Sequence, residues 1–175
     1  MRRRYFLILL AAISINSAIS TNLLAVEIEG AFGYRFGDTV LASNIIDRYE
    51  SAFPALQESY HVTPLVHNRD LDTYSVTMCK YFHTITNISG FKLFDSREEA
   101  MTFLEKYNRF LETKYGKFNR KTMNDPTTGT YKETLIKNAA SVSVLVVNKS
   151  MNPPQWAFMI MYDNIPLTRQ CGVRY

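Results

Sequence analysis

The sequence of 175 residues lacks the short patterns that mark several common enzyme classes. It contains no G-x-S-x-G, which carries the nucleophile of many esterases, and no H-E-x-x-H, which binds zinc in many peptidases. Both glycine patterns that bind nucleotides, G-x-G-x-x-G and G-x-x-x-x-G-K-[ST], are also missing. These absences leave no local signature of catalysis. We therefore expect no cofactor and no metal ion, and we favour a protein that is not an enzyme.

Positive charge is also scarce once the N-terminus is set aside. The chain carries 20 basic and 16 acidic side chains, but residues 1–25 hold three arginines and no acidic residue. The remaining chain therefore has 17 basic and 16 acidic side chains. Because nucleic-acid binding needs an excess of lysine and arginine on one face, we expect no nucleic-acid partner.

The N-terminus has the features of a secretory signal peptide. Three arginines precede an apolar run over residues 5–15, which is shorter than the roughly 20 residues that span a bilayer. Small side chains at Ala18 and Ser20 predict cleavage after Ser20, or as late as residue 25. We expect residues 1–20 to export the chain to the periplasm or the medium, so that it meets a membrane only before cleavage. An uncleaved anchor and a twin-arginine signal are the alternatives.

Only two cysteines are present, Cys79 and Cys171. Exported proteins enter an oxidising compartment, so an even pair predicts a disulfide. Such a bond would restrict the unfolded chain and stabilise the fold by roughly 4 to 5 kcal/mol in the entropic model. Two separate buried thiols are the alternative, whereas a redox-active pair is disfavoured because no Cys-x-x-Cys occurs.

Residues 21–175 have the length and composition of a single domain. The strongest helix signal covers residues 96–115, where Ser96 and Glu99 fit a capping box and apolar residues recur at helical spacing. A shorter helix is predicted over residues 39–50 from a moderate apolar stripe, following a turn at Gly37.

Alternating apolar and polar residues predict strands at 60–66, 73–80, 84–94, 131–138, 141–148 and 156–163. Short connections favour antiparallel pairing, while the polar segment 119–130 predicts a loop and Gly90 a kink. The sequence thus predicts an α+β fold, an antiparallel sheet of about five to six strands with the helices at about 96–115 and 39–50 packed on it. Apolar residues on both faces of the last strands indicate that both faces are covered or that one binds a partner.

The segment GAFGYRFGDTV, residues 30–40, holds three glycines near the N-terminus. Glycines at such spacing sometimes bind phosphate, but neither nucleotide pattern is complete. An extended chain would place Phe32, Tyr34 and Phe36 on one face, and Gly37 would begin a turn. We therefore interpret the segment as a strand followed by a turn.

Four motifs make the chain resemble small exported bacterial proteins of uncharacterised function: Phe36-Gly37-Asp38, Tyr60-His61-Val62-Thr63-Pro64, Lys114-Tyr115-Gly116 and Tyr162-Asp163. The likeness spans most of the mature chain. It implies a fold and a location in the bacterial envelope, and it brings no catalytic residues. Such proteins often have a cysteine just ahead of the long helix, whereas here Cys79 comes earlier.

Two clusters remain as candidates for chemistry. His67-Asn68-Arg69-Asp70-Leu71-Asp72 combines an imidazole with two carboxylates that could hold a divalent cation, although we favour a solvated turn. Cys79 and His83 are close in sequence, but in an extended strand they would lie roughly 13 Å apart, too far for proton transfer. Neither cluster predicts catalytic or metal-binding residues.

The expected function is binding. Tyrosine and phenylalanine are abundant, with eleven of each, and tyrosine suits both cores and interfaces. We expect an exported, periplasmic, non-catalytic protein that binds a protein or an envelope component. The alternatives are a small envelope hydrolase whose site is not visible as a local motif, and a carrier of a small apolar ligand between sheet and helix.

Overall fold

A computed structural model describes residues 27–137, 139–151 and 154–173. The predicted signal peptide, residues 1–20, and its cleavage position after Ser20 lie outside the described residues. The elements are β1 (Gly30–Ala31), β2 (Tyr34–Arg35), η1 (Ala42–Asn44), β3 (Ile45–Tyr49), β4 (Gln57–Val62), β5 (Thr73–Cys79), β6 (Thr84–Phe94), α1 (Arg97–Tyr115), β7 (Asn119–Asp125), β8 (Thr130–Lys137), β9 (Ala140–Met151), β10 (Pro154–Asn164) and α2 (Ile165–Gln170).

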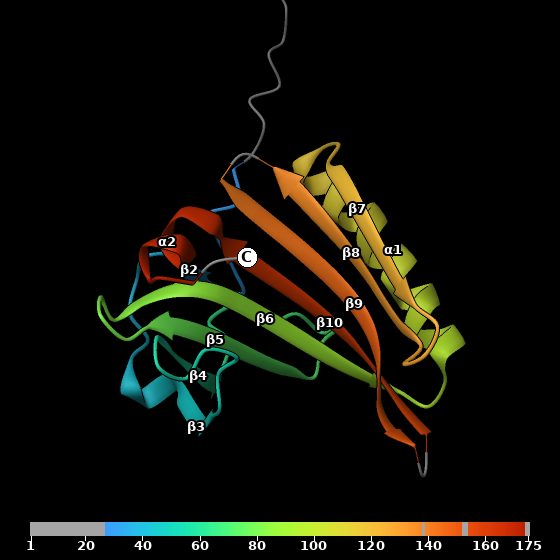
Figure 1. The fold of residues 1–175 in the computed structure, drawn as a ribbon, viewed down its shortest axis with the longest axis horizontal. Helices are drawn as coiled ribbons and strands as arrows, with labels where there is room; N and C mark the ends of the chain where they lie inside the picture. Colours follow the sequence, from blue (N-terminus) through green and yellow to red (C-terminus); the bar gives the residue numbers. More distant parts are fainter. Residues whose placement is uncertain (1–26, 138, 152–153, 174–175) are drawn as a thin grey trace, which may run out of the picture.

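The fold is mostly β (Figure 1). Eight strands form one antiparallel sheet in the order β3-β4-β5-β6-β10-β9-β8-β7, and β1 pairs with β2 in a separate hairpin. The described chain adds one long helix, α1, and one short helix, α2. The predicted α+β fold, with a sheet of five to six strands and two packed helices, is therefore wrong. The missing strands are the two edges, β3 and β7.

The helix predicted over residues 39–50 is replaced by the short 3-10 turn η1 and strand β3. On β4, Val62 pairs with Ile45 and Ser59 pairs with Tyr49. Ile45 is followed by a second isoleucine, and β-branched side chains favour an extended backbone. The apolar stripe that suggested a helix is short enough to fit a strand as well, and the pairing with β4 decides between them.

The segment predicted as a polar loop, residues 119–130, forms edge strand β7 and the turn into β8. Every residue from Asn119 to Asp125 pairs with β8. Nearly all side chains of β7 are exposed, and polar side chains protect an edge strand from pairing with another molecule. The polarity that suggested a loop is therefore a consequence of the edge position.

Other predicted elements are confirmed. β6 spans the predicted 84–94, whereas the strand predicted at 60–66 lies at Gln57–Val62, as β4, and shares only residues 60–62 with the prediction. α1 follows Ser96, whose hydroxyl accepts a hydrogen bond from the Glu99 amide at 3.2 Å, and it ends at Gly116 with a φ of 81°. Within the described chain, neither helix combines the length and apolar character needed to cross a membrane.

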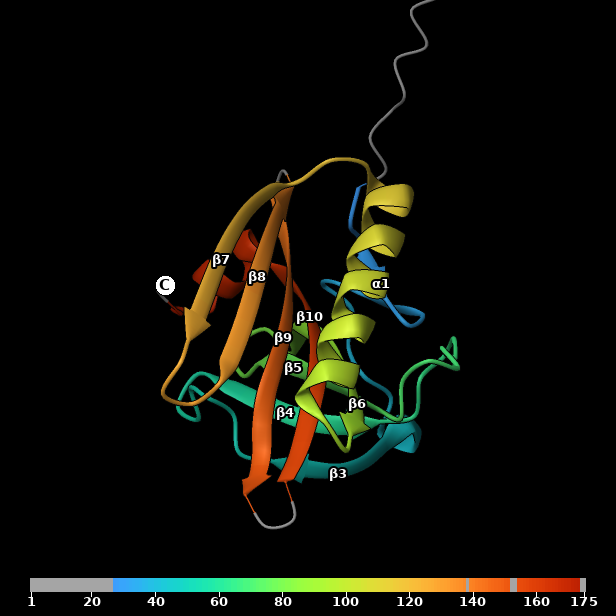
Figure 2. The ribbon, with the colours of Figure 1, turned by 90° about the vertical axis from the view of Figure 1, so that its right-hand side faces the viewer.

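The core lies on one face of the sheet. Figure 2 shows α1 and the N-terminal hairpin on the same side of the strands. On β10, Phe158, Ile160 and Tyr162 are almost completely buried on this side. They pack with buried apolar residues of α1 and the neighbouring strands: Leu104, Leu111, Ile88, Val142, Val144 and Val146. Burying side chains of this size contributes about 1.5 to 3 kcal/mol each.

The β1–β2 hairpin covers the rest of this core. The Phe32 ring packs against the Tyr74 and Tyr162 rings, with centroids 4.9 Å and 5.8 Å away. Gly90, predicted to kink β6, lies within the continuous strand, where a β-carbon would come within 2.6 Å of Leu71 and 3.1 Å of Phe32. The absence of a side chain at Gly90 therefore allows Leu71 and Phe32 to pack closely against β6.

The two cysteines lie near the ends of β5 and α2. The structure places Cys79 and Cys171 at disulfide distance, with their Cα atoms 5.6 Å apart. A bond there attaches the C-terminal segment to the end of β5 that is next to the β5–β6 turn.

Buried tyrosines predict a loss of stability at alkaline pH. Burial raises the pKa of Tyr162 well above its ordinary value, and burial followed by the Glu133 carboxylate raises the pKa of Tyr131 to about 12. A pKa raised in the folded state means that the stabilisation is complete below about pH 10 and is lost as the pH rises through the folded value. The free energy of unfolding should therefore fall above about pH 10.

We predict that Tyr162→Phe makes this decline shallower, because the buried hydroxyl no longer ionises. Urea titrations at neutral and alkaline pH measure the effect. Tyr81→Phe is the matched control, because Tyr81 is 68% exposed. Equal pH dependence in Tyr162→Phe and the wild type would contradict the prediction.

Candidate functional site

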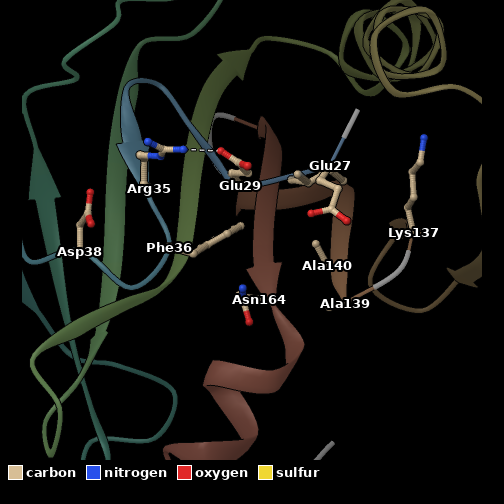
Figure 3. Close-up of a pocket in the computed structure, with 10 residues that line it drawn as sticks. Glu27, Glu29, Arg35, Phe36, Asp38, Lys137, Ala139, Ala140 and Asn164 are labelled. Carbon is tan, nitrogen blue, oxygen red and sulfur yellow. Dashed lines mark hydrogen bonds and ion pairs between the residues drawn. The ribbon is translucent and has the colours of Figure 1, made fainter. Parts of the chain in front are cut away.

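The glycine-containing N-terminal segment lines a cleft of about 510 Å³ (Figure 3). Arg35 is ion-paired with Glu29, and Lys137 lies at the far margin of the cleft. The side chain of Asn164 accepts a hydrogen bond from the Leu167 amide at 3.0 Å and so caps α2. Acidic side chains outnumber basic ones in this lining, which disfavours a phosphate. This cleft therefore lacks the positive charge of a phosphate site.

The glycines of this segment serve a hairpin. Residues Phe32 and Gly33 form its turn, with φ of 53° and 86°, and β1 pairs with β2. The predicted turn at Gly37 is confirmed, whereas the single strand before it is a hairpin of two short strands. The expectation that Phe32, Tyr34 and Phe36 share one face of a single strand is wrong, because the chain reverses at Phe32.

The polar cluster at residues 67–72 is a loop fastened to α1. The side-chain amide of Asn68 donates a hydrogen bond to the Tyr107 hydroxyl at 2.6 Å. Asp70 forms an ion pair with Lys106 at 3.1 Å. These contacts give the polar side chains structural partners, which agrees with a turn more than with a cation site. Among the described residues, no group of three or more His, Cys, Asp or Glu is placed to hold a metal ion.

The cysteine–histidine candidate also has a structural role. Because Cys79 lies at disulfide distance from Cys171, its sulfur is not available as a nucleophile. His83 lies in the turn after β5 with a φ of 52°, and its amide donates a hydrogen bond to the Cys79 carbonyl at 2.8 Å.

The sheet face opposite α1 carries two connected hollows, which we call the sheet groove. One hollow has a volume of about 570 Å³ and the other of about 360 Å³. Both are lined by Asn87 of β6 and by Met161 and Asp163 of β10, so they meet over the two central strands. Ligand pockets typically have volumes of about 300 to 1,000 Å³.

Short hydroxyl side chains form part of the floor of the sheet groove. Strand register places Ser75, Ser89, Met161, Ser143 and Thr134 in one row across five neighbouring strands. Three pairs of hydroxyls lie within hydrogen-bonding distance: Ser59–Thr77 at 2.9 Å, Ser75–Ser89 at 2.7 Å and Thr134–Ser143 at 3.2 Å. Short side chains that satisfy one another leave the space above them open.

The larger hollow, the apolar hollow, is lined by aromatic and methionine side chains. Tyr49 and Phe53 lie on one side, and Phe91, Met159 and Met161 lie on the central strands. The two methionines are only partly buried, although their neighbours on β10 belong to the core. Methionine is flexible and polarizable, so it adapts to ligands of irregular shape.

The smaller hollow, the cationic hollow, gathers positive charge. It is lined by Lys121 of β7, Lys132 of β8 and Arg169 of α2. Within the described chain, none of these three side chains forms an ion pair. The carboxylate in the lining belongs to Asp163, which accepts a hydrogen bond from the Thr168 hydroxyl at 2.8 Å.

Asp47, His61 and Ser75 lie in one row across β3, β4 and β5, the residue types of a hydrolase triad. His61 Nδ1 lies 2.6 Å from Asp47 Oδ1. Ser75 is fully buried, and its hydroxyl accepts a hydrogen bond from the Tyr49 hydroxyl at 3.1 Å and lies 2.7 Å from Ser89 Oγ. A hydroxyl enclosed in this way cannot reach a substrate carbonyl, so the row is structural.

Few of the residues that line the sheet groove were candidates from the sequence. His61 lines it, whereas His67 and His83 lie elsewhere. Lys121 and Lys132 carried no recognisable pattern, because only the pairing of β7 with β8 brings them to one face. The one available signal was the second apolar face of the last strands, which contains Met159 and Met161.

Comparison of the chain with protein-family models, curated proteins and solved structures finds no match. The geometry of the described residues therefore carries the functional argument.

The N-terminal hairpin predicts a difference between two glycines. A β-carbon at Gly33 would lie 2.5 Å from Leu65 Cβ, whereas at Gly37 the nearest atom, Leu167 Cδ1, would be 4.0 Å away. Both have positive φ, so Gly37→Ala measures backbone strain alone, about 1 kcal/mol. We predict that Gly33→Ala lowers the free energy of unfolding by about 1 to 3 kcal/mol more. Equal losses in urea denaturation would show that the hairpin does not pack against Leu65.

Proposed function

We propose that the protein is an exported, non-catalytic binding protein that holds an envelope component in the sheet groove. The observation that carries this proposal is the groove itself, since one face of the sheet is filled by the core and the other is open, with an apolar hollow of about 570 Å³. A sheet face without a ligand function would be expected to carry long polar side chains toward solvent. Here the floor combines short hydroxyls with Met159, Met161 and Phe91.

The geometry favours binding over hydrolysis. The Asp47–His61–Ser75 row has an enclosed serine, and the row begins on the edge strand β3. Catalysis by a serine requires a hydroxyl that contacts both a base and the substrate. Ser75 contacts the hydroxyls of Ser89 and Tyr49 instead.

The position of the groove differs from that expected for a carrier. A ligand between sheet and helix would have to displace Phe158, Leu104 and Leu111, which are at most 1% exposed. Displacing buried side chains of this size would cost several kcal/mol, about 2 to 5 for each one lost from the core. The space opposite α1 needs no such rearrangement.

The proposed location is an oxidising compartment outside the cytosol. The cysteine pair at disulfide distance supports this, because such pairs are stable mainly in exported proteins. The proposed mature chain begins after Ser20, and it carries 17 basic and 16 acidic side chains beyond residue 25.

A neutral apolar dye tests the groove. N-phenyl-1-naphthylamine should fluoresce more strongly on adding the folded protein, with saturable binding. Met161→Trp should weaken this binding about tenfold or more, because the larger side chain fills the junction of the two hollows. Phe110→Trp is the matched control, since Phe110 lies on α1 and is 49% exposed. Absence of saturable binding, or equal binding by both variants, would contradict the proposal.

Intact-protein mass spectrometry tests the location and the cysteines. The protein purified from the periplasm should begin at Thr21 and should gain two hydrogen atoms on reduction, because the thiols are paired. Finding the full-length chain in the cytosol with both thiols free would contradict the proposed export.

A further inference from the structure

We infer that the sheet groove binds a single-chain lipid with an anionic phosphate headgroup, the headgroup in the cationic hollow and the acyl chain in the apolar hollow. This inference rests on the proposed function and names the ligand class for the same site. It is carried by the segregation of charge along one continuous groove.

The cationic hollow carries positive charge that is not balanced by ion pairs among the described residues. Lys121, Lys132 and Arg169 come from three different elements and line one hollow of about 360 Å³. None of them is paired with a carboxylate among the residues that the structure describes, and Lys132 is only partly exposed. Like charges in one hollow repel, so this arrangement becomes more favourable when an anion binds.

This cluster of positive charge contrasts with the nearly neutral chain around it. The chain beyond residue 25 has only one more basic than acidic side chain. Elsewhere several basic residues have acidic partners, such as Arg48 with Glu58 and Lys106 with Asp70. The groove therefore attracts an anion although the whole molecule has little net charge.

The cationic hollow also contains hydroxyl groups that can bind a phosphate headgroup. Thr134 and Ser143 lie in the cationic hollow within 3.2 Å of each other, and Ser141 is in the same lining. Hydroxyls can donate to phosphate oxygens and can also accept from the hydroxyls of a glycerol group. Lysine and arginine form charge-assisted hydrogen bonds with phosphate, which are stronger than bonds between neutral groups.

The apolar surface extends from the cationic hollow into the apolar hollow. Met161 belongs to both hollows, while Met159 and Phe91 continue into the apolar hollow. Lys121 lies on β7 and Phe91 on β6, four strand spacings apart, about 19 Å along the sheet. A single acyl chain attached to a headgroup can follow this path, whereas a small anion would leave the apolar hollow unused. Lys149 at the edge of that hollow can lie along a chain through its apolar stem.

The experiment compares two lipids with the same acyl chain, lysophosphatidylglycerol and lysophosphatidylcholine, below their micelle concentrations. Displacement of N-phenyl-1-naphthylamine from the mature protein reports the binding of each. We expect lysophosphatidylglycerol to bind about tenfold or more tightly, because one charge-assisted contact contributes about that factor. The preference should shrink at high ionic strength, because salt screens exposed charges.

The double variant Lys121→Gln/Lys132→Gln should lose about tenfold or more in affinity for lysophosphatidylglycerol, and it should lose less for lysophosphatidylcholine, whose choline group already offsets the charge of its phosphate. The matched control, Arg109→Gln/Lys117→Gln, removes the same charge from exposed positions that do not line the groove. It should change neither affinity. Binding of the neutral dye by both double variants shows that the groove is intact.

Equal binding of both lipids with intact dye binding would overturn the inference and leave the proposed function standing. If the wild type did not bind the dye, the proposed function itself would be wrong. Glycerol 3-phosphate alone should displace the dye far more weakly than the lipid. If it bound as tightly as lysophosphatidylglycerol, the site would be a plain anion site and the role assigned to the apolar hollow would be wrong.

Discussion

The pairing of β10 with β6 on one side and β9 on the other is the constraint on which the rest of the structure depends. It places Phe158, Ile160 and Tyr162 under α1, and because side chains alternate it sends Met159 and Met161 to the opposite face. A shift of one residue would bury the methionines and expose the aromatic residues. The buried apolar row therefore determines both the core and the groove.

The two faces of the sheet differ in how they treat water: one face buries the core and the other leaves a groove open. The face under α1 excludes water through large side chains, and the buried carboxylate of Glu133 accepts hydrogen bonds from Asn108 at 2.6 Å and Tyr131 at 2.5 Å. The opposite face combines Phe91, Met159 and Met161 with short hydroxyl side chains that pair across strands, so that burial of Ser75 and Ser89 carries little penalty. Lys121, a long charged side chain, lies on the edge strand β7. This arrangement opens a groove without weakening the core.

Local signals in the sequence predicted the elements whose residues agree at short range. The capping residue Ser96 and the stop at Gly116 defined α1, and the alternation of Tyr74, Val76 and Met78 with their neighbours defined β5. The edge strands β3 and β7 were missed because an edge is defined by its partner, and its polar or mixed residues suit a loop or a short helix equally well. The groove could not be predicted for a related reason. Lys132 and Arg169 are distant in sequence, and only the strand order and the position of α2 bring them together.

The methionine methyl groups report on both faces of the sheet, so they test directly whether a ligand binds in the sheet groove. Met159 and Met161 line the groove, whereas Met78 and Met101 pack with the core on the other side. Methyl NMR spectra recorded during titration with N-phenyl-1-naphthylamine should show ring-current shifts at Met159 and Met161, with Met78 and Met101 unchanged. Shifts at Met101 without shifts at Met161 would place the ligand against α1 and contradict the account.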